Sequence, residues 1–127
     1  MRDHETAMCA YAQLATLSHE KGQPLARDRF LLLTGVTACR AGWPEVAAEC
    51  HAQLVRAKSP MQVTQFPSFE TALRDDDFPR LADHWERWCP FERAEHLLQG
   101  LGRSPRGDAA DEPVGPLVVT LLVTISG

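Results

Sequence analysis

Residues 26–60 read ARDRFLLLTGVTACRAGWPEVAAECHAQLVRAKSP, and this stretch decides the fold class of the chain. It carries small or helix-ending residues at the separations of a helical hairpin, namely Gly35, Gly42, Ala47 and Pro60. Gly42 suits the short turn between two antiparallel helices, and Pro60 suits their end. Gly35 and Ala47 are expected to face each other, because only small side chains let two helix axes approach closely.

A further helix is predicted before the hairpin. Asp3 suits its N-cap and Gly22 its C-terminal stop, while apolar and small side chains recur between them at helical spacing. The helix is therefore expected to run from about Asp3 to Lys21. Pro24 follows and opens the first hairpin helix, at a position where its missing N–H costs nothing.

Three shorter helices are predicted after the hairpin. Ser68 caps the first, residues 75–77 end it and cap the second, and the third spans about residues 91–101. No stretch before residue 114 alternates with the period of two that marks a strand. The predicted fold class is therefore all-α, a small helical array or bundle of five to six helices over residues 1–102.

Composition limits the function classes. The 127 residues are 44% hydrophobic and 24% charged, which suits one globular domain with a buried core. The 13 basic and 17 acidic residues give a formal charge of −4 without a basic cluster, which argues against a nucleic-acid surface. Residues 1–5 lack an apolar signal-like run, so free thiols and a cytoplasmic location are expected for the four cysteines.

The C-terminal part changes in character. A flexible linker is predicted over residues 103–116, because residues 102–113 hold no large apolar side chain. Residues 117–127 form an apolar tail, too short to span a bilayer, which takes about 20 residues as a helix. Its Val and Ile content, and the preceding Gly115-Pro116, favour an extended or disordered tail.

Three fates are open for this apolar tail. It adds as an edge strand to a partner, pairs with another copy of itself, or docks into a groove of the helical domain. Since no sheet is predicted in the domain, the tail is expected to find its partner outside the chain, by self-association for instance, or to stay disordered in the monomer.

The hairpin resembles a tetratricopeptide repeat, a family of helix–turn–helix units of about 34 residues. The matching positions are the first large apolar residue, the two small contacts, the turn glycine and, one residue late, the terminal proline: Leu31, Gly35, Ala47, Gly42 and Pro60. The departures are Ala38 at a usually aromatic position and Trp43-Pro44 in place of an acidic-aromatic pair. No second copy follows at the same period, and an unrelated helical bundle is the alternative. The resemblance implies binding of a peptide or protein partner.

The predicted function is accordingly a non-catalytic helical module for protein–protein interaction. Its partner is expected to be a protein or peptide, with no cofactor, no nucleic acid and no membrane span. The expected contact surface lies between residues 30–41 and the first helix. The candidate partner-binding residues are Tyr11, Phe30, Thr34 and Thr37.

The alternative is a metal-binding protein or a cysteine-dependent enzyme centred on Cys89, with His84 and His96. The three residues lack the close ligand pairs of structural zinc sites, and they span a corner at Pro90. Nearby glutamates would oppose a Cys89 thiolate. A structural cysteine at a tight corner is the competing interpretation, and the neighbouring aromatic residues are predicted to form a second small core: Trp85, Trp88 and Phe91.

Overall fold

The structure, a computed structural model, describes residues 3–106 and 114–126. In these residues it contains seven α-helices, one short 3-10 helix and no strand. The all-α prediction is confirmed, with six α-helices before residue 102. In chain order the elements are α1 (His4–Glu20), α2 (Pro24–Ala41), α3 (Pro44–Arg56), η1 (Gln62–Gln65), α4 (Phe69–Leu73), α5 (Phe78–Trp88), α6 (Phe91–Gln99) and α7 (Val114–Ser126).

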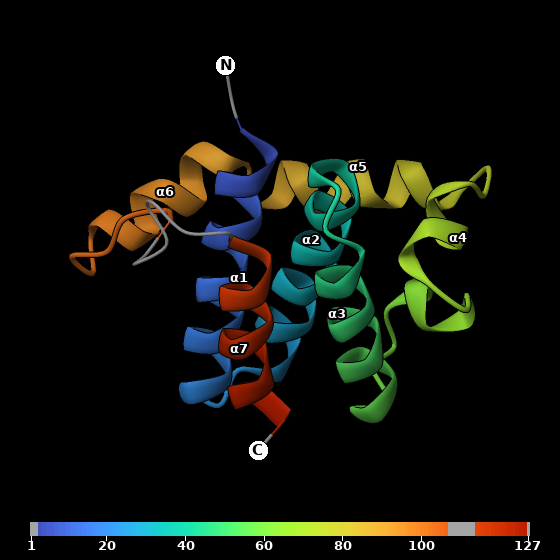
Figure 1. Ribbon diagram of the computed structural model, residues 1–127, viewed down its shortest axis with the longest axis horizontal. Coiled ribbons are helices and arrows are strands. Elements are labelled where there is room, and N and C mark those ends of the chain that lie inside the picture. Colours follow the sequence, from blue (N-terminus) through green and yellow to red (C-terminus); the bar gives the residue numbers. More distant parts are fainter. Residues whose placement is uncertain (1–2, 107–113, 127) are drawn as a thin grey trace.

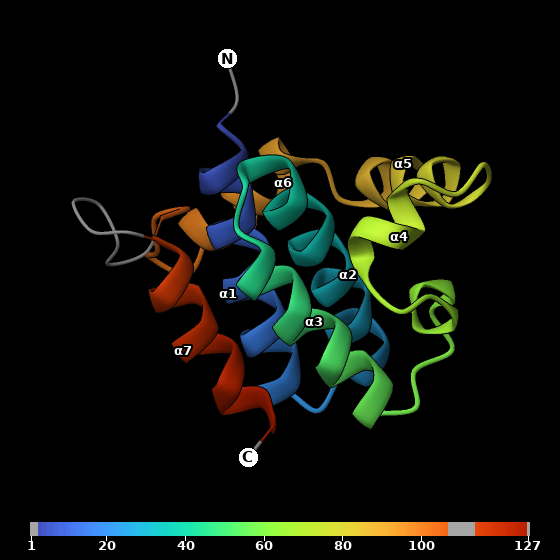
Figure 2. The ribbon, with the colours of Figure 1, turned by 45° about the vertical axis from the view of Figure 1, so that its right-hand side comes forward.

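Four helices, α1, α2, α3 and α7, lie side by side as a bundle, and α5 and α6 lie crosswise to them (Figure 1). Around the bundle, α1 packs on α2, α2 on α3, α3 on α7 and α7 on α1, so the four helices close a ring. Helix α4 packs between α2 and α5 (Figure 2). The connections α1–α2 and α2–α3 are very short, which makes these neighbours antiparallel.

Local sequence signals place the helix ends where they were predicted. The Asp3 side chain accepts a hydrogen bond from the Glu5 backbone at the start of α1, and Ser68 accepts one from Thr71 at the start of α4. Before α5, the Asp75 carboxylate accepts hydrogen bonds from the Asp77 and Phe78 backbones.

Four helices end in the same way, each closed by a left-handed residue after its last turn. The left-handed residues are Gly22, Gly42, Lys58 and Gly102, with φ angles of 68°, 82°, 52° and 73°. In each case the next backbone N–H donates to a carbonyl five residues earlier, in the pairs Gln23–Ser18, Trp43–Ala38, Ser59–Leu54 and Arg103–Leu98. These ends stop α1, α2, α3 and α6 abruptly and allow the tight turns between the first three.

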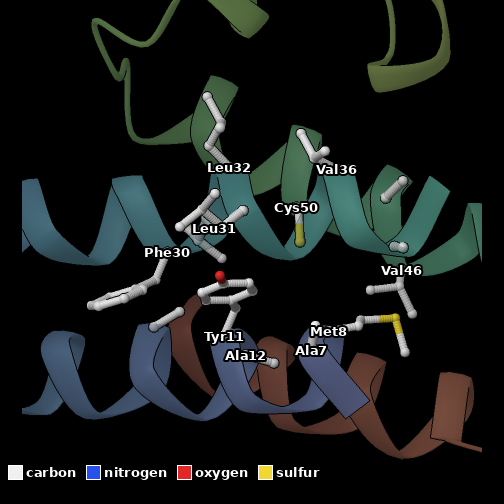
Figure 3. Close-up of a cluster of buried hydrophobic side chains, with 14 of the residues drawn as sticks. Ala7, Met8, Tyr11, Ala12, Phe30, Leu31, Leu32, Val36, Val46 and Cys50 are labelled. Carbon is white, nitrogen blue, oxygen red and sulfur yellow. The ribbon is translucent and has the colours of Figure 1, made fainter. Parts of the chain in front are cut away.

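The core lies mainly around α1 and α2. Residues 7–16 of α1 and 30–38 of α2 are all buried, on every side of each helix. Figure 3 shows Tyr11 of α1 beside Phe30 and Leu31 of α2, and Met8 of α1 beside Val46 of α3. Neither segment contains a charged residue, so both must be covered all round by other helices.

Gly35 makes a different contact from the one predicted. A Cβ built on Gly35 would overlap the ring of Phe69, which projects from α4 and is fully buried. The contact that requires glycine is therefore with α4, whereas the pairing of Gly35 with Ala47 stays a prediction. Ala47 is itself buried in α3. The hairpin pattern alone could not indicate a side chain that arrives from 34 residues further along the sequence.

We expect Gly35→Ala to destabilise the protein, although alanine is the better helix former by about 1 kcal/mol. Overpacking against Phe69 should cost about 1–3 kcal/mol, measured by urea unfolding. Gly100→Ala is the matched control, because a Cβ there would meet only backbone oxygens at ordinary distances of 3.5 and 3.7 Å. A Gly35→Ala variant as stable as the Gly100→Ala control would contradict the close contact.

The apolar tail is a helix, and the prediction of an extended or disordered tail is wrong. Helix α7 packs on α1 and α3, and Val118, Leu122 and Ile125 are buried along one of its faces at helical spacing. Burial of these aliphatic side chains outweighs the preference of Val and Ile for extended backbone. Of the three fates left open, docking onto the helical domain is the one that the structure shows.

One steric contact and one hydrogen bond show the direction of α7 along α3. The Trp43 ring occupies the space that a Cβ on Gly115 would need, and its Nε1 donates to Glu5 Oε2 over 2.6 Å. Near the other end, the buried Gln53 side chain donates from Nε2 to the Leu122 carbonyl over 2.6 Å. Since Trp43 precedes α3 and Gln53 lies late in it, α7 runs parallel to α3 (Figure 2).

The predicted linker falls into three parts. Residues 107–113 lie outside the described residues, and residues 114–116 belong to α7. Residues 103–106 follow the surface of α1. There the Gln13 amide donates to the carbonyls of Ser104 and Pro105, and Arg106 pairs with Asp3 over 3.2 Å. This part of the linker is therefore held against the domain.

We expect Leu122→Ala to lower the free energy of unfolding by about 2–5 kcal/mol, because the Leu122 side chain is fully buried on the face of α7 that packs on α1 and α3. Val123→Ala is the matched control, since Val123 is 51% exposed and its truncation should change stability by less than about 0.5 kcal/mol. Thermal and urea unfolding measure both. If the two variants have the same stability, α7 does not cover the core in solution.

Candidate functional site

The four predicted partner-binding residues are all buried, which corrects the predicted surface. Tyr11, Phe30, Thr34 and Thr37 lie in the core, and Thr34 has no exposed surface at all. The expected groove between α1 and α2 is filled, because these two helices pack directly against each other over their length. The hydroxyls of Thr34 and Thr37 donate to carbonyls one turn earlier in α2, so they need no partner outside it.

Tyr11 joins α1 to the corner between α5 and α6. Its hydroxyl donates to the Cys89 carbonyl over 2.7 Å in a buried position. The Tyr11 ring also stacks on Phe30, with 6.5 Å between ring centroids. Tyr11 thus holds the crosswise helices onto the bundle and has a structural role.

We expect Tyr11→Phe to destabilise the protein by about 1–3 kcal/mol, because the buried Cys89 carbonyl loses its donor while the packing of the ring is kept. Chemical denaturation measures the change. Thr64→Val is a useful comparison, since the Thr64 hydroxyl bonds to a carbonyl only three residues earlier and its loss should cost less. A Tyr11→Phe protein with wild-type stability would remove Tyr11 from this role.

The structure gives the alternative centred on Cys89 no geometric support. In residues 3–106 and 114–126, no group of three or more His, Cys, Asp or Glu side chains is placed to hold a metal ion. Burial raises the pKa of the Cys89 thiol to about 11, although Arg93 acts to lower it. The thiol is therefore protonated at neutral pH and a poor nucleophile. His84 packs edge-on against Trp85, and His96 faces a groove described below.

All four cysteines are free, and burial raises the pKa of each. For Cys9 the pKa rises to about 11, and for Cys39 to about 12 with help from Glu70. At pH 8 we expect the folded protein to react with iodoacetamide about 100-fold more slowly than the denatured protein, because the thiolate is the reacting form. Mass spectrometry of the alkylated peptides measures each site. One fast thiol in the folded protein would revive the cysteine-dependent alternative.

The aromatic residues after α4 form part of the core boundary. Trp85, Trp88 and Phe91 are partly buried, as predicted, but they pack against the main core and do not form a second one. The two tryptophans meet edge to face, and the guanidinium of Arg29 lies over both rings, 4.7 and 5.2 Å from their centroids. Arg29 thus occupies the space that an aromatic recognition pocket would offer.

The candidate site is instead a groove between the C-terminal half of α1, the start of α2 and the end of α6, which we call the α1–α6 groove. It has a volume of about 430 Å³. The residues that line it are Leu14, Leu17, Ser18, Lys21, Gln23, Phe30, His96, Leu97, Gly100 and Leu101.

Apolar side chains form most of the α1–α6 groove. Leu14 and Phe30 are buried and make its floor, whereas Leu97 and Leu101 stand 40% and 51% exposed in its wall. These two leucines are four residues apart on α6 and the turn that follows it. Large aliphatic side chains left in water beside an apolar floor are typical of a binding surface.

The groove depends on how α1 and α6 end. Gly22 and Gly102 close the two helices in left-handed conformations, so each chain turns away and leaves the space beyond its last turn open. The polar side chains lie at this part of the site: Ser18 and Lys21 from α1 and the turn after it, Gln23 before α2 and His96 from α6.

In the sequence, Leu97 and Leu101 are four residues apart and so fall on one side of the helix predicted over residues 91–101, without marking a site. Within α6 only Ala94 and Leu98 are fully buried, so the apolar stripe is wider than the core contact needs. That surplus is the only signal for the groove in the sequence of α6. The opposite wall of the groove comes from α1, about 80 residues earlier in the sequence, and the α1 sequence has no such surplus of apolar residues.

Comparison of the chain with known protein families, curated proteins and solved structures finds no match. Among the described residues, no helix is both long and apolar enough to cross a membrane.

Proposed function

We propose that the protein is a non-catalytic helical module that binds a protein or peptide partner in the α1–α6 groove. The observation that carries the proposal is the exposure of Leu97 and Leu101 above a floor of buried apolar side chains. Burying these leucines against a partner would remove apolar surface from water, which is the main driving force of most protein association.

Other features of the described residues support a binding role over a catalytic one. Ser18 and His96 both line the groove, but among the described residues no hydrogen bond joins them, and Ser18 is nearly buried. All four thiols are held protonated by burial. The similarity of residues 26–60 to a tetratricopeptide repeat also favours partner binding, because repeat hairpins of that family present peptide-binding surfaces.

The experiment is a selection from a displayed random-peptide library against the wild-type protein. Enriched peptides are then titrated by fluorescence anisotropy against a Leu97→Asp/Leu101→Asp variant and a Val55→Asp control. Val55 is 46% exposed on α3 and does not line the groove, so the control adds the same kind of charge elsewhere.

The double variant should weaken peptide binding by at least about 10-fold, because two central apolar contacts become charged. The control should bind within about 2-fold of wild type. Circular dichroism checks that each variant is folded. Peptides that bind the double variant as tightly as wild type, or a selection without enrichment, would overturn the proposed function.

A further inference from the structure

We infer that the occupant of the α1–α6 groove is a short amphipathic helix that carries carboxylates beside its apolar residues. This inference rests on the proposed function and names the chemistry of the partner. It comes from the charges and hydrogen-bonding groups around the groove, together with the spacing of its apolar wall.

The polar lining of the groove is complementary to carboxylates. Of the described residues that line it, four are polar, and each of these side chains carries a hydrogen-bond donor: Ser18, Lys21, Gln23 and His96. None of the lining residues is Asp or Glu, although the whole chain has 17 acidic residues and a formal charge of −4. Lys21 is the one charged residue among the described residues that line the groove, so the lining carries a positive charge on an acidic protein. An acidic partner is attracted there and repelled by the rest of the surface.

The backbone at the groove is also electrostatically compatible with a negatively charged partner. A helix C-terminus normally disfavours anions, because its last carbonyls point outward without donors. Here the Ser18 carbonyl accepts from Gln23, and the Leu98 carbonyl accepts from Arg103, so the turns after α1 and α6 already use these oxygens. Lys21 is the exposed C-cap residue of α1 and provides the positive charge.

The apolar wall favours a helical occupant. Leu97 and Leu101 are separated by one helical turn, and Leu17 of α1 lies across the groove from α6. A partner helix with apolar residues at positions i and i+3 or i+4 places two side chains on one face, which suits a groove of about 430 Å³. Asp or Glu next to those residues would reach the donors at the rim.

The test uses the same peptide library, now selected in parallel against wild type, Lys21→Glu and Lys58→Glu. Lys58 is the matched control, because it is the chain's other lysine, is exposed and does not line the groove. Wild type and Lys58→Glu should enrich peptides with Asp or Glu beside paired apolar residues. Lys21→Glu should lose this preference and bind a selected acidic peptide about 3- to 10-fold more weakly.

Raising NaCl from 50 to 500 mM should weaken the binding of the acidic peptide to the wild-type protein, because salt screens exposed charge pairs. The same change should affect its binding to Lys21→Glu much less. Peptides that depend on Leu97 and Leu101 but show no acidic preference, or a basic one, would overturn this inference and leave the proposed function standing. Absence of any peptide that depends on these leucines would overturn both.

Discussion

The absence of charge from the middle of α1 and α2 is the constraint on which the rest of the structure depends. Residues 7–16 and 30–38 hold no Asp, Glu, Lys or Arg, so neither helix has a face that belongs in water. A two-helix hairpin covers only one side of each. The remaining helices are therefore arranged as covers: α3 and α4 on α2, α6 and α7 on α1, and α5 at the crosswise end. The ring of four bundle helices follows from this need.

The predictions from sequence succeeded where the deciding interaction is local and failed where it is distant. Asp3, Ser68 and Gly42 act within a few residues of themselves, so their capping roles can be read without knowledge of the fold. The contact that requires Gly35 depends on Phe69 of α4, and the helical state of residues 114–126 depends on surfaces of α1 and α3. Short-range propensity favours an extended tail, and long-range burial decides otherwise.

The site residues illustrate the same limit. An aromatic ring and hydroxyls on a helix suggest a recognition surface, yet Tyr11, Thr34 and Thr37 satisfy their polar atoms inside the fold. Polar atoms are no evidence of exposure, because a helix carbonyl or a corner carbonyl can satisfy them inside the fold. The exposed leucines of the α1–α6 groove are indicated in the sequence only by an apolar stripe on α6 that is slightly wider than its core contact.

The groove and the core are separate consequences of one geometry. Helix α6 crosses the bundle rather than running along it (Figure 1), and its Ala94 and Leu98 are fully buried while Leu97 and Leu101 are exposed. The exposed leucines lie outside the ring of bundle helices, because α6 is not one of the four. A partly exposed surface of this kind can change its side chains at less cost to folding than the core, which a binding specificity requires if it is to diverge on a constant scaffold. Lys21 and His96 lie on that same surface, where selection for a partner's charge would act without touching the buried helices.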